Sequence, residues 1–223
     1  MTDLAGKKEI LAGRSDMIED VSDMTLSHRG HTVTVPARGW RSDETGVWTP
    51  SSEAMDLAGD ISVILRARAA GLRITMVAAA DEAWGIGLAG GLPWRCPEDL
   101  RHFRRRTMGG RLLMGRTTFE GLPATLDGRT VHILSSASAD GFATMEGALA
   151  NLAGQEGSEI LVAGGGSVYA AALGYCTHAE VTRIPGHHGC DTFMPDLGKA
   201  GWNLARRERL AGSIEIEHWE NMT

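Results

Sequence analysis

Two junctions between a predicted strand and a predicted helix have the residue types that bind phosphate. Gly164-Gly165-Gly166 follows the apolar run Ile160–Ala163 and precedes a helix predicted over Ser167–Leu173. Glycines let the backbone approach a pyrophosphate closely, and the N–H groups at a helix N-terminus favour an anion. A tight turn would use the same glycines, so this triplet alone leaves both interpretations open.

The other junction is Met114-Gly115-Arg116-Thr117-Thr118, which offers a guanidinium group and two hydroxyls. Charge-assisted hydrogen bonds from arginine suit a phosphate group, although a surface arginine beside a helix cap would look the same. Two such junctions in one small sheet point to a dinucleotide with several phosphates.

Asp99 lies in the first turn of a helix predicted over Pro97–Met108, shortly after Leu92-Pro93-Trp94. A carboxylate at this position often only complements the helix dipole. It can also hydrogen-bond a charged or amidine-like heterocycle in a pocket. Leu100 and Phe103 are three residues apart and are expected on the buried face of this helix, so the carboxylate would stand beside an apolar wall.

Two other clusters are expected to carry no chemistry. His187 and His188 are adjacent, Cys190 follows, and no second pair of ligands has the spacing of a metal site, so we predict no metal. The run Arg104-Arg105-Arg106 is expected to be a solvated helix face.

The composition narrows the class of protein. The chain has 223 residues, of which 43% are hydrophobic and 22% charged, as in globular proteins. A net charge of −6 gives no general basic surface for nucleic acid. We expect no membrane span, because the sequence has no run of about 18 apolar residues. We expect no signal peptide, because MTDLAGKKEI has no long apolar stretch after its charges. Cys96, Cys176 and Cys190 are sparse and odd in number, which predicts reduced thiols and a cytoplasmic protein.

Strands and helices alternate from Arg73 onward, which predicts a mainly parallel sheet with helices on both faces. Buried strands are expected at Ile74–Ala80, Leu112–Met114, Val131–Leu134 and Ile160–Ala163, short helices at Thr117–Leu122 and Ala148–Ala153, a loop at Asp81–Arg95, and a terminal antiparallel hairpin from Trp202–Arg209 and Ile214–Trp219.

Residues 1–72, here called the extension, have a different character. His31–Val35 alternates like a strand, and Thr49-Pro50 looks like the start of a helix that extends to residue 70. Apolar side chains at helical spacing mark one face of that helix: Leu57, Ile61, Ile64 and Leu65.

Short motifs follow one another between residues 73 and 223. They are Ile74–Ala79, Gly85-Ile86-Gly87, Leu92-Pro93-Trp94, Pro97–Leu100 with Phe103, Met114–Thr118, Gly128-Arg129, Leu134–Ser136, Gly164–Tyr169, Thr182, and Asp191-Thr192 before Pro195. In this order and spacing they resemble dihydrofolate reductase over 73–223. The resemblance implies a three-layer α/β fold and reduction of 7,8-dihydrofolate to tetrahydrofolate with NADPH as cofactor.

The resemblance also implies roles on the substrate side. Asp99 matches the carboxylate that binds the pterin ring, and Thr182 matches the hydroxyl partner of that carboxylate. Trp94 matches the family's tryptophan near an ordered water. Leu92, with the glycine-rich segment 85–91, resembles the mobile loop that closes over the nicotinamide. Arg129 matches the arginine that holds the glutamate tail of the substrate. The remaining substrate contacts implied are Val77, Ala78, Leu100, Phe103, Leu122 and Ala163.

On the cofactor side, Arg116, Thr117 and Ser136 match residues near the 2′-phosphate and ribose. The family's non-proline cis peptide is expected between Gly165 and Gly166. The full set implied is Ala79, Ile86, Gly87, Gly115, Arg116, Thr117, Thr118, Leu134, Ser135, Ser136, Gly164, Gly165, Gly166, Ser167, Val168 and Tyr169.

Three positions depart from the pattern of the family. Ser167 stands where many relatives have arginine, so selection of NADPH rests on Arg116. Ala163 replaces a larger aliphatic residue of the pterin pocket, which predicts weaker binding of diaminopyrimidine antifolates such as trimethoprim. Cys190 replaces a frequent glycine.

The extension faintly resembles the N-terminal zinc domain of certain bacterial toxin–antitoxin antitoxins, in His31–Pro36, Gly39-Trp40, Ser42–Gly46 and the helix over 53–70. The cysteine pair of that domain would fall at Ser42 and Thr45, so a zinc site is not expected. The alternative is a helix docked on the reductase behind a loose tail. We expect residues 73–223 to be a separate domain that stays active without residues 1–70, unless the apolar stripe is buried.

Two other functions are compatible with the sequence. A related reductase acts on a deaminated riboflavin precursor, but it calls for neither Asp99 after Pro93-Trp94 nor Arg129. The chain could also be a binding protein that keeps the reductase fold and contacts a protein partner through residues 1–72.

Overall fold

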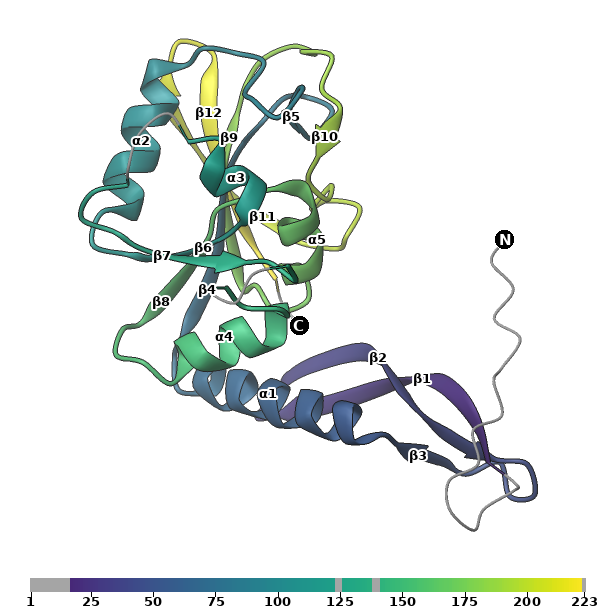
Figure 1. Ribbon diagram of the computed structural model, residues 1–223. Helices are drawn as coiled ribbons and strands as arrows, with labels where there is room; N and C mark the ends of the chain where they lie inside the picture. The colour runs from purple at the N-terminus through teal and green to yellow at the C-terminus, as the bar shows by residue number, and fades with distance from the viewer. Residues whose placement is uncertain (1–16, 123–125, 138–140, 222–223) are drawn as a thin grey trace.

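The computed structural model describes residues 17–122, 126–137 and 141–221 (Figure 1). One sheet has seven strands in the order β11-β12-β9-β4-β8-β6-β7. The strands are β4 Arg73–Ala80, β6 Arg111–Gly115, β7 Thr130–Leu134, β8 Glu159–Val162, β9 His178–Arg183, β11 Asn203–Ala211 and β12 Ile214–Glu220. Strands β4, β6, β7, β8 and β9 run parallel to one another, whereas β12 pairs antiparallel with both β9 and β11. The predicted mainly parallel sheet with a terminal hairpin is therefore confirmed.

The four helices of this region cover both faces of the sheet (Figure 1). They are α2 Pro97–Thr107, α3 Arg116–Glu120, α4 Met145–Ala153 and α5 Gly166–Ala172. Because successive strand residues point to opposite faces, Met76 and Ala78 of β4 join a large core cluster with α4 and α5. Val77 joins a smaller cluster against which Phe103 of α2 packs.

Three sequence predictions in this region were wrong in detail. Leu100 does not lie on the buried face of α2, since 54% of its surface is exposed, whereas Asp99 and Thr107 are buried. The strand at Val131–Leu134 is only half-buried, because β7 is the edge of the sheet. The segment Asp81–Arg95 is not all loop, because β5, Gly85–Gly87, pairs with β10, Thr192–Phe193.

Arg106 also contradicts its prediction as part of a solvated helix face. It donates two hydrogen bonds to Glu159 of β8, at 2.8 and 2.9 Å, and one to Glu180 of β9 at 2.7 Å. Only 20% of its side chain is exposed. The physical reason is that the last turn of α2 crosses two acidic strand residues, which a charge run in the sequence does not reveal.

The extension forms a second sheet of three strands, β1 Met17–His28, β2 His31–Ser42 and β3 Trp48–Pro50. The predicted strand at His31–Val35 is the start of β2, and β1 was not predicted because its polar residues obscure the alternation. Arg29 and Gly30 both have positive φ, 47° and 87°, as the two-residue turn of a hairpin requires.

The helix of the extension, α1, spans Ser52–Ala69. Its start is not at Thr49-Pro50 as predicted, because Pro50 ends β3 and the hydroxyl of Ser51 accepts the capping hydrogen bond from the N–H of Ala54. The predicted stripe is buried: Ile61, Ile64 and Leu65 are at most 1% exposed.

This stripe belongs to the same core cluster as residues of the large sheet and α4. Figure 1 shows α1 lying along α4 while the β1–β2 hairpin extends away from the sheet. The extension and the seven-stranded sheet therefore share one continuous core. None of the described helices is both long and apolar enough to cross a membrane.

Candidate active site

A buried carboxylate lies where α2 begins. Asp99 is 8% exposed, and the Sγ atom of Cys96 caps its backbone N–H at 3.4 Å. The hydroxyl of Thr182, itself 1% exposed on β9, donates to the Asp99 carboxylate. Burial raises the pKa of Asp99, although the bond from Thr182 and the nearby His102 act in the opposite direction. A hydrogen-bonded acid with this pKa can exchange a proton or bind a cationic heterocycle.

Tyr169 is a buried residue of α5 near this carboxylate, and it bonds to the strand β4. Its phenol donates to the carbonyl oxygen of Val77 at 2.7 Å. Burial, with Asp99 nearby, raises the pKa of Tyr169, so the phenol stays neutral and polar. Val77, Ala78 and Ala163 are all less than 9% exposed and line the adjacent strand ends.

The glycine triplet forms the junction between β8 and α5. The cis peptide joins Gly164 to Gly165, not Gly165 to Gly166 as predicted, because Gly166 already begins α5 and Gly164 carries the positive φ of 108°. The carbonyl of Gly164 accepts from the N–H of Gly115 at 2.9 Å. This bond places the two glycine junctions side by side.

Side chains cannot replace these glycines without displacing neighbours. A Cβ atom at Gly166 would lie 2.5 Å from the carbonyl oxygen of Phe193, and one at Gly165 would lie 3.0 Å from the hydroxyl of Thr118. A Cβ atom added at Gly115 would lie 3.1 Å from the Cγ2 atom of Val168. Packing against the protein itself therefore requires glycine at these positions.

Arg116 directly follows Gly115 and is the first residue of α3. Its Nε donates to the hydroxyl of Ser135 at 3.1 Å, and its Nη1 lies 3.5 Å from Glu120. Thr117 and Ser136 are exposed beside it, and Ser167 is exposed on α5. A guanidinium group with adjacent hydroxyls fits a phosphate monoester.

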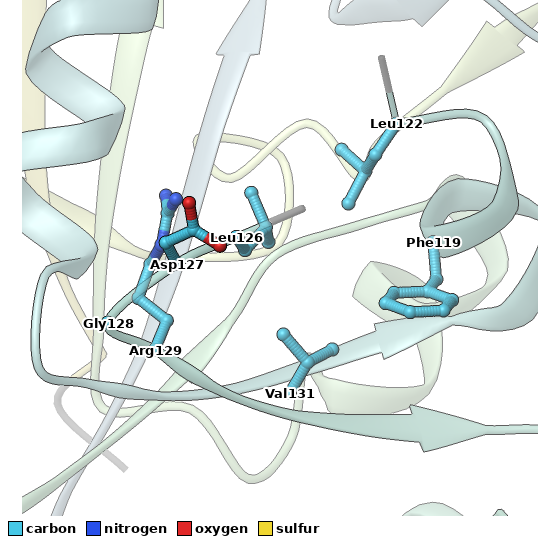
Figure 2. Close-up of a pocket in the computed structure, with 7 residues that line it drawn as sticks. All are labelled: Phe119, Leu122, Leu126, Asp127, Gly128, Arg129 and Val131. Carbon is cyan, nitrogen blue, oxygen red and sulfur yellow. The ribbon is translucent and has the colours of Figure 1, made fainter. Parts of the chain in front are cut away.

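A groove of about 440 Å³ opens beside this region (Figure 2). Phe119, Leu122, Leu126 and Val131 form its apolar walls, with Arg129 and Asp127 together at one end. Arg129 donates to the hydroxyl of Thr107 at 3.4 Å, and its buried Nε has no hydrogen-bond partner among the described residues. The groove fits an elongated aromatic ligand that ends in an anion.

The segment between β4 and α2 borders the site. Ala89 donates its N–H to the carboxylate of Asp191 at 2.8 Å, and Leu92 is 55% exposed at the end of this turn. Trp94 packs edge-on against His188, with ring centroids 5.2 Å apart. The indole N–H of Trp94 is buried and has no partner within the part of the chain that the structure describes, so it is available to a bound water.

Comparison with known proteins identifies the family. A dihydrofolate reductase from Neisseria gonorrhoeae is 35% identical over 155 residues, covering 66% of this chain and 94% of that protein. The enzyme from Mycobacterium tuberculosis H37Rv is 45% identical over 108 residues, covering 44% and 63%. A sequence model described as "Dihydrofolate reductase" matches residues 73–218. The chain belongs to the dihydrofolate reductase family.

A solved dihydrofolate reductase supports the fold assignment. The enzyme from Enterococcus faecalis, complexed with NADP(H) and RAB-propyl, superposes with a TM-score of 0.59 at 25% identity. The match covers 66% of this chain and 95% of that one. The extension accounts for most of the uncovered part, because the family match begins at residue 73.

Three of the family motifs lie at the carboxyl ends of parallel strands: Gly115 ends β6, the glycine triplet follows β8, and Thr182 is the penultimate residue of β9. Arg129, in contrast, precedes the first residue of β7. Phe119, Leu126 and Val131 were not selected from the sequence, although they line the groove. A signal existed for Val131, which pairs with buried Leu112 of β6 and therefore shares its face. Leu126 gave no such signal, because it belongs to neither a helix nor a strand.

Proposed function

We propose that this protein reduces 7,8-dihydrofolate to 5,6,7,8-tetrahydrofolate, with NADPH as the hydride donor. The observation that carries the proposal is a buried carboxylate, Asp99, bonded to Thr182 and lying within the part of the chain that matches dihydrofolate reductase. NADPH, when bound, supplies the hydride that adds to C6 of dihydrofolate.

The pterin ring would bind through Asp99, which accepts hydrogen bonds from the ring N–H and the 2-amino group. Thr182 fixes the orientation of that carboxylate. Val77, Ala78 and Ala163 would cover the ring, since they are the buried strand residues beside it.

The benzoyl and glutamate part of the substrate would occupy the groove in Figure 2. Leu100 is exposed and Phe103 half-buried, which suits apolar walls that a ligand covers. Leu122 lines the groove, and the guanidinium group of Arg129 at its end would donate to the α-carboxylate of the glutamate. A charge-assisted bond there is worth about 1.5–3 kcal/mol.

The cofactor would bind across the paired glycine junctions. Gly115 and the triplet Gly164–Gly166 would approach the pyrophosphate, while Arg116, with Thr117 and Ser136, would hold the 2′-phosphate. The other contacts proposed are Ala79, Ile86, Gly87, Thr118, Leu134, Ser135, Ser167, Val168 and Tyr169.

Protonation of N5 would use water, because Asp99 is proposed to hold the other side of the ring. The raised pKa of Asp99 keeps part of the enzyme protonated nearer to neutral pH. Trp94 offers its free indole N–H to the water, and Leu92 would close over it. The residues of the chain therefore bind, orient and exclude bulk solvent, and the cofactor carries the redox chemistry.

A direct assay tests the proposal. Purified protein with NADPH and dihydrofolate should show a falling absorbance at the nicotinamide band. A protein that turns over a deaminated riboflavin precursor instead would belong to the alternative reductase, and the absence of turnover with either substrate would contradict enzymatic function.

We also propose that residues 73–223 carry the activity and that the extension supports them. The family match begins at the first strand of the large sheet, which supports this division.

A further inference from the structure

The loop 184–191, between β9 and β10, carries a histidine that the proposed mechanism does not use. His188 is half-buried, whereas the adjacent His187 has 71% of its side chain exposed. The ring of His188 packs edge-on against the indole of Trp94, with the ring centroids 5.2 Å apart. Aromatic pairs at centroid distances of about 4.5–7 Å favour this mutual orientation. His188 therefore restricts the positions that the indole can take.

Two hydrogen bonds hold His188 itself in place. Its backbone N–H donates to the carboxylate of Asp81 at 3.0 Å. Its ring Nε2 lies 3.1 Å from the carbonyl oxygen of Pro185, and this nitrogen must carry a hydrogen because a carbonyl oxygen only accepts. One bond fixes the backbone and the other fixes the rotation of the side chain, so the imidazole is a firm support for the indole.

Asp81 ties this loop to the end of the strand β4. It directly follows Ala80, the last residue of β4, and is 2% exposed. Its carboxylate also accepts hydrogen bonds from the backbone N–H groups of Ala83 and Gly85, at 2.9 and 2.8 Å. Burial opposes the ionisation of this carboxylate, but the backbone bonds outweigh burial and lower the pKa of Asp81, so it stays charged. The loop that carries His188 is therefore anchored to the sheet.

The group that this support would aim is the indole N–H of Trp94. Its nitrogen is buried and has no hydrogen-bond partner among residues 17–122, 126–137 and 141–221. A donor without a protein partner can hold a bound water in one place only if the ring that carries it is itself fixed. The contact with His188 fixes that ring, and the anchors of His188 make the contact rigid.

We propose that His188 is a positioning residue, which holds the indole of Trp94 in the orientation that presents its N–H to the water near N5 of dihydrofolate. The inference rests on the proposed function, in which that water protonates N5. His188 acts through Trp94 and not on the substrate, and no proton passes through it. Its loss should therefore lower kcat and leave both KM values nearly unchanged.

The first test is steady-state kinetics of variants with NADPH and dihydrofolate. His188→Ala removes the ring and should lower kcat about three- to tenfold, the worth of an edge-on aromatic pair, while each KM changes less than about twofold. His188→Phe keeps a ring and should recover most of the lost kcat. His187→Ala is the matched control, because His187 is adjacent and exposed, and it should keep the wild-type kcat. A wild-type kcat for His188→Ala, or an equal loss in His187→Ala, would overturn the proposal.

A double-mutant cycle separates positioning from a general loss of structure. Trp94→Phe removes the indole N–H, so adding His188→Ala to that variant should lower kcat no further. A further loss as large as the one in the wild-type background would show that His188 acts on another part of the enzyme, against the proposal. His188→Gln, which keeps a donor for Pro185 but has no ring, takes the place of His188→Ala with the same expectations if His188→Ala does not fold.

The indole N–H signal of Trp94 in NMR gives a second readout, which needs no turnover. The signal is assigned by its loss in Trp94→Phe. His188→Ala should shift it and speed its exchange with solvent, whereas His187→Ala should leave it in place. Absence of turnover by the wild type would contradict the proposed function, whereas an unmoved signal in His188→Ala beside an active wild type would overturn only this inference.

Discussion

At the scale of single residues, Asp99 combines a functional role with a cost in stability. Its pKa is raised in the folded protein by burial, so folding favours the protonated form. Stability is therefore lost as the pH rises from the unfolded pKa of Asp99 to its folded pKa, and the loss is full above the folded pKa. Asp99→Asn should therefore lower kcat by about 10²–10⁴ and yet raise the midpoint of urea unfolding at pH 7.

The matched control for this variant is Glu98→Gln, one residue earlier in the same helical turn. Glu98 pairs with Arg101 on the exposed side of α2, so its loss should leave kcat unchanged. A wild-type kcat for Asp99→Asn at neutral pH would contradict the proposed role of the carboxylate.

Arg116 should determine the choice of cofactor. Ser167 supplies no second cation at the 2′-phosphate, so Arg116→Ala should raise KM for NADPH far more than KM for NADH. Initial rates with both cofactors measure the ratio, and Arg66→Ala, an exposed arginine on α1, serves as control. Equal effects on both cofactors would place the 2′-phosphate elsewhere.

Ala163 should control the ratio of inhibitor affinity to substrate affinity. Its side chain is 8% exposed in the small core cluster with Val77 and Met114. Ala163→Ile adds apolar contact worth about 0.8 kcal/mol per buried methylene, so trimethoprim should bind about tenfold more tightly. Dihydrofolate, which is also held by Arg129, should gain less. An unchanged inhibition constant with unchanged KM would mean that neighbouring side chains already fill the space.

At the scale of elements, an ionic cluster joins α2 to the middle of the sheet. Arg106 binds Glu159 and Glu180, and Thr75 donates to Glu159. Burial of Glu159 opposes its ionisation, but the bonds from Arg106 and Thr75 outweigh burial and lower its pKa. The stabilisation from this depressed pKa is present above the unfolded pKa of Glu159 and is lost as the pH falls through the folded pKa.

Arg106→Met should accordingly cost on the order of 3 kcal/mol at pH 7, since it removes the arginine that Glu159 and Glu180 share and leaves Glu159 with Thr75 and the more distant Arg73. The difference from the wild type should shrink as the pH falls toward 4, where the carboxylates become protonated. Urea unfolding at both pH values measures this change, with Arg105→Met as the control on the exposed side of α2. A loss of stability that is independent of pH would assign the role of Arg106 to packing.

Elements also show where prediction from sequence succeeds. The strands β4, β6 and β8 were located because both of their faces are buried and their apolar runs are continuous. The strand β1 was missed because its exposed face carries Asp and Thr, and its partner lies across a turn that starts with Arg29 and not with Asn or Gly. The partners of Arg106 could not be found, because they are 53 and 74 residues away in the chain.

In the candidate site, too, features set by the local sequence could be predicted and features set by tertiary packing could not. Groups fixed by local motifs, such as Asp99 at a helix start and the glycine triplet, could be selected from spacing and resemblance. The exposure of Leu100 and the position of Leu126 in the groove wall depend on tertiary packing, which the local sequence does not specify.

At the scale of the whole molecule, the extension is part of the fold. The expectation that residues 73–223 remain active without residues 1–70 is reversed by the burial of Ile61, Ile64 and Leu65. Exposing these three side chains costs about 1.5–3 kcal/mol each, which approaches a total stability of about 5–15 kcal/mol. Deletion of residues 1–70 should therefore yield an insoluble or inactive protein.

A pair of substitutions tests this without deletion. Ile64→Asp should abolish soluble, active protein, because it places a charge in the shared core, whereas Met55→Asp should be tolerated on the same helix, where Met55 is 64% exposed. Expression, thermal unfolding and turnover are the measurements. An active, stable Ile64→Asp variant would show that the extension docks weakly.

The continuous core has a consequence for how the molecule responds to a ligand. Val33 of β2 belongs to the same cluster as Ile74 of β4 and Leu149 of α4. Amide protons in the hairpin should then exchange with solvent mainly when the whole chain opens. A folate analogue bound in the distant groove should slow that exchange by the same factor in β2 as in β4, so hydrogen–deuterium exchange in the hairpin would report occupancy of a site that the hairpin does not touch.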